Sequence, residues 1–381
     1  MVTMSRRGNN EGTIRQRADG KWEAAVQFNG RRHWLRAASQ AEARRGLAEL
    51  RRKHATGELV PPSRLTVAEH LGTWLEVAGA DLRPRTRVDY EWVTRTFLIP
   101  AFGHVRLQRL TPAMVALEFA RLNTAGTHSP KTRLNAFRTF HRALTVARYW
   151  GLIGTNPLDA VEAPKASRSA PSIWSRDEAE TFLAALQPGA WDATLFLILA
   201  GTGCRIGEAL AARWDDFDRD TGALTIRRNI VTIHGAYVEG DPKTQAGKRT
   251  VVLPGFAIDG LKAWRPAQLA QRLAAGPSWR DSGRIITLSD GESPAHHIAY
   301  SRFKGTCGAA GVPKTRMHDL RHLHASFLLS AGLPLPAVSA RLGHANPAIT
   351  ARFYAHALAG VDSAAATAID GLATRPAAAS G

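Results

Sequence analysis

The segment RMHDLRHLHAS, residues 316–326, contains three histidines and two arginines within eleven residues. Arg321 and His322 lie three and four positions after His318, so a helix would present them on the same face as His318. Such a face could bind a metal ion or an anion. The zinc-protease motif needs glutamate directly after its first histidine, where this chain has Asp319, and an arginine beside a metal is unfavourable. The residue types therefore favour an anion site with a histidine that can move protons.

The segment GTGCRIG, residues 201–207, adds a further arginine at a turn that leads into a helix. It nearly matches a dinucleotide-binding fingerprint, but Ile206 stands where that motif needs its third glycine, and a helix-like apolar stretch precedes it instead of a strand. We therefore interpret Arg205 as an anion ligand, because guanidinium groups bind phosphate through paired, charge-assisted hydrogen bonds. Arg205, Arg321 and the His318 imidazole could hold a phosphodiester and stabilise its five-coordinate transition state.

The charge of the chain points to a polyanionic partner. There are 50 Lys and Arg against 32 Asp and Glu, which gives a net charge of +18. The excess is spread along the chain, with +8 in residues 1–64, +4 in 65–164 and +6 in 165–381. This distribution is typical of a protein that lies along nucleic acid. An arginine-rich proteome would give the same excess without such a partner, so charge alone leaves both explanations open.

Cysteine content and hydropathy indicate a protein of the cell interior. Cys204 and Cys307 are the two cysteines, which excludes a disulfide framework and a cysteine-based zinc site. No signal-peptide pattern is present, and no run of about 18 apolar residues could span a membrane. We expect a cytoplasmic protein with no membrane partner, no metal and no cofactor, in which Cys204 is a small buried residue.

The hydrophobic patterns predict an α+β, multidomain fold. Residues 1–60 are expected to form a three-stranded sheet around an Asn-Gly hairpin turn, followed by a helix that begins with capping-box spacing at Ser39 and Glu42. The strands are basic, so this small domain could contact DNA, although a solvated charged face would have the same composition. The candidate DNA-binding residues here are Arg15, Arg17, Arg31 and Arg32.

Residues 65–162 are expected to form a helical domain, with linkers at 57–64 and 163–172. Thr66 has the position of a helix cap, and Thr111 and Ser129 each precede a proline that would occupy the first helical position. Exposed arginines on the last helix could face either DNA or solvent alone. They are Arg133, Arg138, Arg142 and Arg148.

Residues 173–372 are expected to form a mainly α domain with one small β-sheet. A capping box at Ser175 begins it, and three β segments within residues 223–254 interrupt the helices. From residue 256 the pattern is helical to about residue 372, and residues 373–381 are expected to be disordered.

Five motifs follow one another between residues 202 and 356: TGCRIGEAL, DPKTQAGKRTVVLP, HDLRHLHAS, LGH and ITARFYAH. In this order and spacing the chain resembles the tyrosine recombinase family, also called phage integrases. The resemblance extends over essentially the whole chain, because integrases of this kind have an arm-binding sheet domain, a helical core-binding domain and a catalytic domain. It implies a site-specific recombinase that cleaves and rejoins DNA, and so integrates or excises phage or mobile-element DNA.

The resemblance assigns the main catalytic roles. Tyr354 matches the nucleophile that forms a 3′-phosphotyrosyl link, and Arg205 and Arg321 match the two phosphate-binding arginines. His318 matches the first residue of the His-x-x-Arg motif, and His344 matches a later His-or-Trp position.

Further residues are assigned in the same way. Lys243 matches the lysine that protonates the leaving 5′ hydroxyl, and Lys248 is close enough to be an alternative. Glu208 matches a supporting acid. His322 and His324 have no matching role and are expected to be structural.

The chemistry agrees with these residue types. A tyrosine hydroxyl has a pKa of about 10, so it needs a base or a positive environment in order to react. The arginines, the lysine and the histidine would supply both. The phosphotyrosyl bond retains the energy of the broken phosphodiester, so religation would need neither ATP nor a metal.

The resemblance also implies partners. These are double-stranded DNA at attachment sites, a homotetramer that works through a four-way junction, and, as an open point, an accessory DNA-bending or directionality factor. The Ala-rich segment after Tyr354 would dock on a neighbouring subunit or pack on its own domain. Two other functions stay open: a type IB topoisomerase, which the separate basic sheet argues against, and a DNA-binding regulator without catalysis, which the complete catalytic set argues against.

Overall fold

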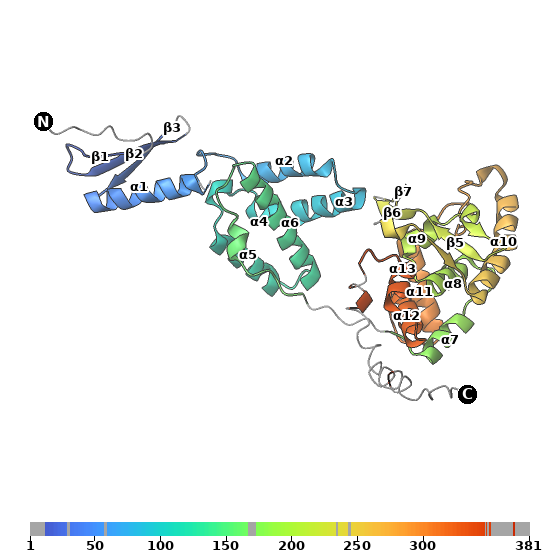
Figure 1. Cartoon of the computed structure of the whole chain (residues 1–381). Helices are drawn as coiled ribbons and strands as arrows, with labels where there is room; N and C mark the ends of the chain where they lie inside the picture. Colours follow the sequence, from blue (N-terminus) through green and yellow to red (C-terminus); the bar gives the residue numbers. More distant parts are fainter. Residues whose placement is uncertain are drawn as a thin grey trace, which may run out of the picture. The chain divides into compact units, whose positions relative to one another are not determined.

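The computed structural model describes residues 12–28, 31–56, 59–166, 173–233, 235–242, 245–346, 348, 350–351 and 369. Lys243, Tyr354, the side chain of Arg31 and the tail 373–381 lie outside these described residues. The chain divides into two compact units, residues 1–168 and residues 169–381, and each is described by itself (Figure 1). The three domain boundaries expected from the sequence stay a prediction.

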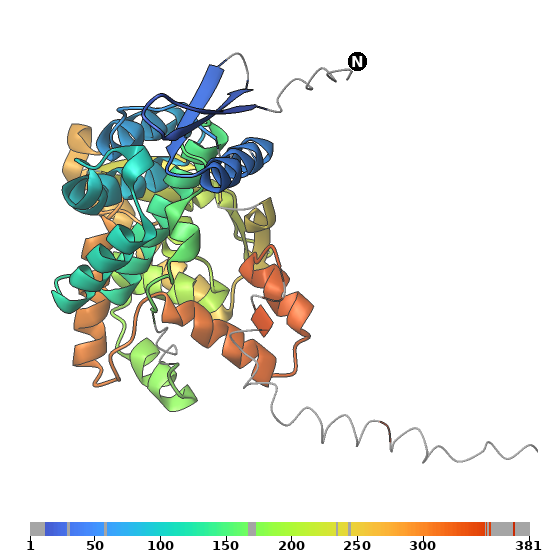
Figure 2. The same ribbon diagram turned by 90° about the vertical axis from the view of Figure 1, so that its left-hand side faces the viewer.

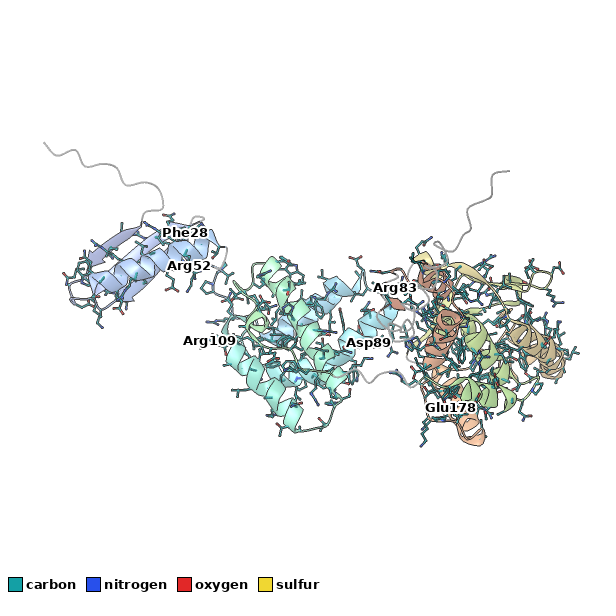
Figure 3. The ribbon with its side chains drawn as sticks, turned by 60° about the horizontal axis from the view of Figure 1, so that its bottom comes forward. Phe28, Arg52, Arg83, Asp89, Arg109 and Glu178 are labelled. Carbon is teal, nitrogen blue, oxygen red and sulfur yellow. The ribbon has the colours of Figure 1, made fainter. Side chains whose placement is uncertain are left out.

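The first unit begins with an antiparallel sheet, ordered β1-β2-β3, that α1 covers on one face (Figures 1 and 2). Ala24, Val26 and Phe28 alternate along β2 and are buried against α1, which confirms the period-two pattern. Phe28, which is labelled in Figure 3, also stacks on His54, with ring centroids 4.0 Å apart. The elements are β1 (Thr13–Gln16), β2 (Trp22–Phe28), β3 (Arg31–Ala37) and α1 (Gln40–Ala55).

The helical region that follows has a separate core, in which Phe102 stacks on Phe140. Thr66 forms a full capping box with Glu69, and Thr111 and Ser129 accept N-cap hydrogen bonds before their prolines, as predicted. The helices are α2 (Val67–Gly79), α3 (Pro84–Val93), α4 (Ile99–Phe102), α5 (Pro112–Thr124) and α6 (Pro130–Tyr149), with a π-helical turn at Thr94–Leu98 and short 3₁₀ turns at Leu107–Arg109 and Pro157–Ala160.

The expectation that Arg133 is exposed is wrong. Arg133 is only 8% exposed, and its Nη1 donates a hydrogen bond to the carbonyl of His128. It lies four and seven residues before Phe137 and Phe140, so it begins the same buried stripe of α6. Arg138, Arg142 and Arg148 are exposed, as expected.

The described part of the second unit has seven α-helices and two small β structures. It contains one large core and a smaller apolar cluster between its last two described helices. Ser175 begins its first helix with a capping box, as predicted. The described helices are α7 (Arg176–Ala184), α8 (Trp191–Thr202), α9 (Ile206–Ala211), α10 (Gly255–Ala275), α11 (His296–Ala309), α12 (Asp319–Ser330) and α13 (Leu335–Leu342). The described strands are β4 (Phe217–Asp218), β5 (Ala223–Ile226), β6 (Asn229–Ile233), β7 (Ala236–Gly240) and β8 (Arg249–Val252).

Two expectations for this unit need correction. The β segments form two structures instead of one sheet: β4, β5 and β8 pair in that order, while β7 pairs with β6 as a separate hairpin. The strand partner of β7 is thus the stretch directly before it, which the sequence analysis did not identify as a strand. The helical pattern is also interrupted, because residues 279–295 form turns and irregular chain in which Gly283 and Gly291 adopt positive φ.

None of the helices that the structure describes combines the length and apolar character needed to cross a bilayer.

Gly207 offers a test of how α9 is packed. A Cβ atom at Gly207 would collide with the Asn229 side chain and the Ile230 carbonyl of β6. We expect Gly207→Ala to lower the free energy of unfolding by about 1–3 kcal/mol, because the backbone must shift to admit the methyl group. Gly305→Ala is the matched control, since its Cβ in α11 would meet no atom within 4 Å. That control should raise stability by about 0.5–1 kcal/mol. Urea unfolding of both variants measures the difference, and equal stability of the two would contradict the packing.

Candidate active site

The first arginine of the site is held at a helix start. Arg205 is the N-cap residue of α9, where the chain turns after α8. Its Nη1 donates to Oε1 of Glu208 at 2.7 Å, and its backbone N–H donates to Oε2 at 3.1 Å. Glu208 is 2% exposed, whereas the Arg205 side chain keeps 29% of its surface open. The carboxylate therefore fixes a guanidinium that solvent or a ligand can still reach.

The second arginine is almost fully buried. Arg321 of α12 is 4% exposed, and its Nη1 donates to the Gly203 carbonyl at 2.7 Å. Its Nη2 is buried and has no hydrogen-bond partner among the described residues. Burial and, to a smaller extent, the nearby Arg205 lower the pKa of Arg321 to about 10. Arg321 is still a cation at pH 7, so one of its N–H groups is ready for an anionic ligand.

A third arginine, Arg249 at the start of β8, was missed by the sequence analysis. Its side chain is 8% exposed, and both Nη1 and Nη2 lie 3.2 Å from Oε2 of Glu208. Its Nε donates to the Arg341 carbonyl at 2.6 Å. The sequence offers one indication of this role: Arg249 lies in the motif that contains the candidate lysines Lys243 and Lys248.

The LGH motif packs directly on this third arginine. Gly343 has a φ of 70°, and a Cβ atom there would lie 2.8 Å from both the Ala246 carbonyl and Nη1 of Arg249. Only glycine adopts this conformation at so close an approach without strain. The motif therefore brings His344, the next residue, to the edge of the arginine cluster.

The histidines of the site are held in different ways. His318 is the N-cap residue of α12, and its ring lies 5.5 Å from the ring of His322 between centroids. The His318 side chain is exposed to solvent. Partial desolvation by neighbouring atoms lowers its pKa, and the nearby Arg321 and His322 act in the same direction. His344 is partly buried, which together with the guanidiniums of Arg321 and Arg205 lowers its pKa to about 4. Both rings are therefore neutral at pH 7.

The turn before α12 depends on Asp319, a further residue that the sequence analysis assigned no role. This carboxylate is 3% exposed. It accepts hydrogen bonds from Thr315 Oγ1 at 3.0 Å and from Arg316 through its backbone N–H, Nε and Nη2 at 2.9–3.1 Å. These bonds fix the chain on both sides of His318.

Charge decides what the cluster can bind. The cluster contains three guanidiniums, those of Arg205, Arg249 and Arg321, and one carboxylate, that of Glu208, which pairs with the first two. Its net charge is +2 with neutral histidines. A phosphodiester has one negative charge, and its five-coordinate transition state has two. The cluster thus matches the transition state better than the ground state. The described residues contain no group of His, Cys, Asp and Glu side chains placed to hold a metal ion.

The remaining candidates do not join this cluster in the described part of the chain. Lys248 is exposed, and its Nζ pairs with Asp241 at 3.0 Å. Lys243 and Tyr354 lie outside the described residues. The candidate DNA-binding residues Arg15, Arg17, Arg31, Arg32, Arg133 and Arg138 belong to the other unit.

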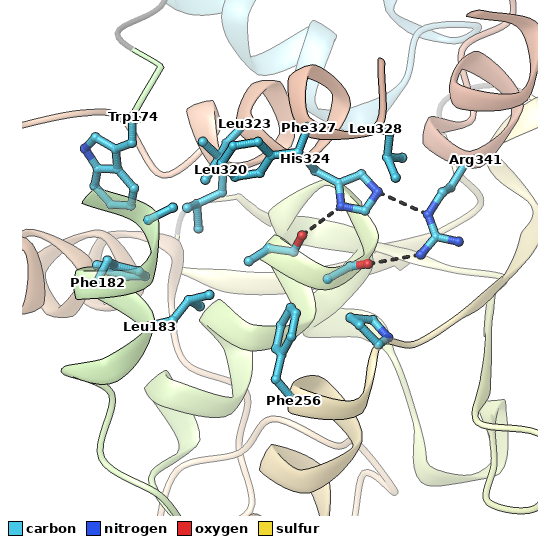
Figure 4. A pocket seen from close by; sticks show the side chains of 14 residues that line it. Trp174, Phe182, Leu183, Phe256, Leu320, Leu323, His324, Phe327, Leu328 and Arg341 are labelled. Carbon is cyan, nitrogen blue, oxygen red and sulfur yellow. Dashed lines mark hydrogen bonds between the residues drawn. The ribbon is translucent and has the colours of Figure 1, made fainter. Parts of the chain in front are cut away.

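His324 is structural, as expected, and lines an apolar cavity on another face of α12 (Figure 4). Its Nδ1 lies 2.8 Å from the Ala200 carbonyl, and Nε of Arg341 donates to its Nε2 at 3.1 Å. The cavity measures about 260 Å³ and is lined by aromatic and aliphatic side chains that include Trp174, Phe182 and Phe327. It contains none of the arginines of the cluster. Cys204 is buried, as expected, which raises its thiol pKa to about 11.

Comparison with known proteins identifies the family. The model of the phage integrase family matches residues 174–360, which include every residue of the cluster. A tyrosine recombinase XerC-like protein of Caldanaerobacter subterraneus is 29% identical over 317 residues, which cover 77% of this chain and 80% of that protein. A putative prophage phiRv2 integrase of Mycobacterium tuberculosis is 27% identical over 379 residues, which cover 95% and 96%. Residues 174–360 therefore form a domain of the phage integrase family, and the relatives of the chain are named as tyrosine recombinases and integrases.

Solved structures agree with this fold. The Tn1549 transposon integrase, in complex with transposon right end DNA, superposes with a TM-score of 0.67 at 22% identity and covers 80% of this chain and 98% of that chain. A lambda integrase tetramer bound to a Holliday junction has a TM-score of 0.55 at 16% identity and covers 92% and 96%. Tyrosine recombinases cleave and rejoin DNA strands, so this integrase is a site-specific DNA recombinase.

The buried histidines make the stability of this integrase depend on pH. Burial lowers the pKa of His324 to about 4, below the value of about 6.5 for an unfolded histidine. The unfolded chain therefore binds the proton first, and stability is lost as pH falls from 6.5 toward 4. We expect the melting temperature to drop over this range. His324→Asn keeps a donor for the Ala200 carbonyl but cannot titrate, so its drop should be smaller. Calorimetry of both proteins at pH 7 and pH 5 measures this, and equal drops would contradict the assignment.

Proposed function

We propose that Arg205, Arg249 and Arg321 bind the scissile phosphate of DNA while Tyr354 attacks it. The observation that carries this proposal is the buried Nη2 of Arg321, which has no partner among the described residues and lies in a cluster of net charge +2. A phosphate oxygen would satisfy this N–H. His344 would donate a further hydrogen bond to the phosphate.

The proposed reaction conserves atoms and charge at each step. The Tyr354 oxygen bonds to phosphorus and the bond to the 5′ oxygen breaks, which gives a 3′-phosphotyrosyl link. His318 takes up the tyrosine proton, since its neutral ring has a free lone pair at pH 7. Lys243 protonates the leaving 5′ oxygen. A 5′ hydroxyl of the partner duplex then attacks the phosphorus and gives its proton to Lys243. The bond from phosphorus to the Tyr354 oxygen breaks, and that oxygen takes its proton back from His318, which completes the exchange of this strand.

The proposed assembly is a tetramer on two DNA duplexes. The support comes from the lambda integrase, which was solved as a tetramer on a Holliday junction, and from the Tn1549 integrase on transposon DNA. Two rounds of exchange through such a junction would join a mobile element to a chromosome at attachment sites. An accessory bending or directionality factor would act on this assembly.

Covalent trapping tests the catalytic residues. Nicked duplexes tiled from the DNA that flanks this gene would be incubated with wild type, Tyr354→Phe, Arg321→Ala and Arg272→Ala. We expect Tyr354→Phe to form no adduct and Arg321→Ala to lose at least about 10²–10³-fold in cleavage rate while it still binds DNA, because one transition-state donor is lost. Arg272 is an exposed arginine of α10, so Arg272→Ala should cleave like wild type.

The other results of this experiment would change the conclusion. Normal cleavage by Arg321→Ala would reject the phosphate-binding role, and an adduct with Tyr354→Phe would reject the nucleophile. Rapid relaxation of plasmids that lack any attachment site would favour a topoisomerase activity.

We further propose that the open face of the N-terminal sheet contacts DNA. Trp34 is 51% exposed on this face, and the guanidiniums of Arg32 and Arg15 lie 4.3 Å and 5.8 Å from its ring centroid. Arg15 also pairs with Glu23 at 2.9 Å, yet its side chain is 68% exposed. In a DNA groove, the exposed aromatic ring could contact apolar base surface, and the two nearby cations could contact phosphates or base edges.

The sheet face has its own test. Arg32→Ala should weaken binding to duplexes that contain the arm site and should lower the slope of log affinity against log salt by about 1, because one phosphate contact is lost. Arg45→Ala, an exposed arginine on α1, is the control and should leave both values unchanged. Fluorescence anisotropy across a salt series measures them, and equal effects of the two variants would reject this face.

A further inference from the structure

The Thr350 hydroxyl contacts the imidazole of His344, a residue of the candidate site. Thr350 is fully buried, at 0% exposed, and its Oγ1 lies 2.8 Å from Nδ1 of His344. Among the described residues this is the one hydrogen bond of the Thr350 side chain. Thr350 also precedes Tyr354 by four residues in the sequence. A hydroxyl at this place can determine which ring nitrogen of His344 bears the proton, and so whether the other nitrogen or the N–H faces a ligand.

The reason lies in the two forms of a neutral imidazole. One ring nitrogen bears the proton and donates, while the other has a lone pair and accepts. A phosphate oxygen is an acceptor, so the nitrogen that faces it must be N–H. If the proton were on Nδ1, the other nitrogen, Nε2, would direct a lone pair at the phosphate and repel it.

The direction of the Thr350 hydrogen bond follows from burial. If Nδ1 donated to Oγ1, the hydroxyl hydrogen of Thr350 would need another acceptor, and the described residues supply none. A buried donor without an acceptor costs about 1–3 kcal/mol. Among the described residues, both hydrogens have an acceptor only if the hydroxyl donates to Nδ1, which puts the ring proton on Nε2. Arg205, Arg249 and Arg321 all oppose a second proton on this ring, so one form dominates.

We propose that Thr350 is a positioning residue that holds His344 in its Nε2–H form, so that the ring donates a hydrogen bond to the scissile phosphate. This inference rests on the proposed phosphate site. It adds a residue that touches no substrate and acts only through His344.

The kinetic test uses two near-isosteric variants. Thr350→Val removes the hydroxyl and keeps the shape, and Thr350→Ser keeps the hydroxyl. Loss of one donor to a developing oxyanion costs about 10²–10³-fold, and the valine variant retains a fraction of the right form, so we expect its single-turnover cleavage to fall by about 10–100-fold. Thr350→Ser should stay within about threefold of wild type, and DNA affinity should be unchanged in both.

A second background separates positioning from packing. His344→Trp places an indole N–H at this position, and an indole nitrogen is always a donor. Thr350→Val should therefore have no further effect on cleavage in the His344→Trp protein. An equal loss in both backgrounds would mean that Thr350 only supports the fold, and wild-type cleavage by Thr350→Val would also overturn the proposal.

A spectroscopic measurement needs no activity. Long-range ¹H–¹⁵N correlation spectra of the full-length, histidine-labelled protein distinguish the two ring forms, and the His344 signal is the one absent from His344→Trp. Wild type should show Nε2–H, and Thr350→Val should show a mixture or Nδ1–H. Nδ1–H in wild type would overturn the proposal. A wild type that shows Nε2–H but forms no Tyr354-dependent adduct would instead reject the proposed function and leave the role of Thr350 on His344 intact.

Discussion

The paired contact of one buried carboxylate with two guanidiniums is the constraint on which the site depends. Glu208 bridges Arg205 at the start of α9 and Arg249 at the start of β8. Without this carboxylate the two neighbouring cations would repel each other, and the buried guanidinium of Arg249 would be costly to desolvate. The shared carboxylate makes the arrangement possible. Among the described residues Arg321 has no acidic partner, so its positive charge would be available to the proposed phosphate.

In the proposed site, the donors would be in place before DNA arrives. Arg321 is fixed by the Gly203 carbonyl, Arg249 by the Arg341 carbonyl, and His344 by Thr350. A preorganised set of donors does not have to reorient as charge develops in the transition state, and this is why such sites are effective in a pocket with little water. The folding of the second unit, and not the binding of DNA, supplies the free energy that orders them.

The sequence predicted the parts of this molecule that depend on local chemistry. Helix caps at Thr66, Ser129 and Ser175 and the period-two strand of the N-terminal sheet follow from neighbouring residues, and all are confirmed. Long-range partners were not predictable. Arg249 meets Glu208 across 41 positions, and nothing in KRTVVLP distinguishes a buried arginine from its exposed neighbour Lys248. Arg133 was expected to be exposed for the same reason: the sequence alone does not show which face of α6 packs against the rest of the domain.

The arginines of the N-terminal sheet and those of the arginine cluster differ in their access to solvent. Salt would therefore affect DNA binding by the sheet and the proposed reaction at the cluster differently. Arg15 on the sheet is 68% exposed, whereas Arg321 in the catalytic cluster is 4% exposed. Dissolved ions screen charges at the surface over about 10 Å at 0.1 M salt, but they screen buried pairs much less. Ionic strength would therefore regulate how often this integrase engages a duplex, while the rate at which an engaged phosphate reacts would change little.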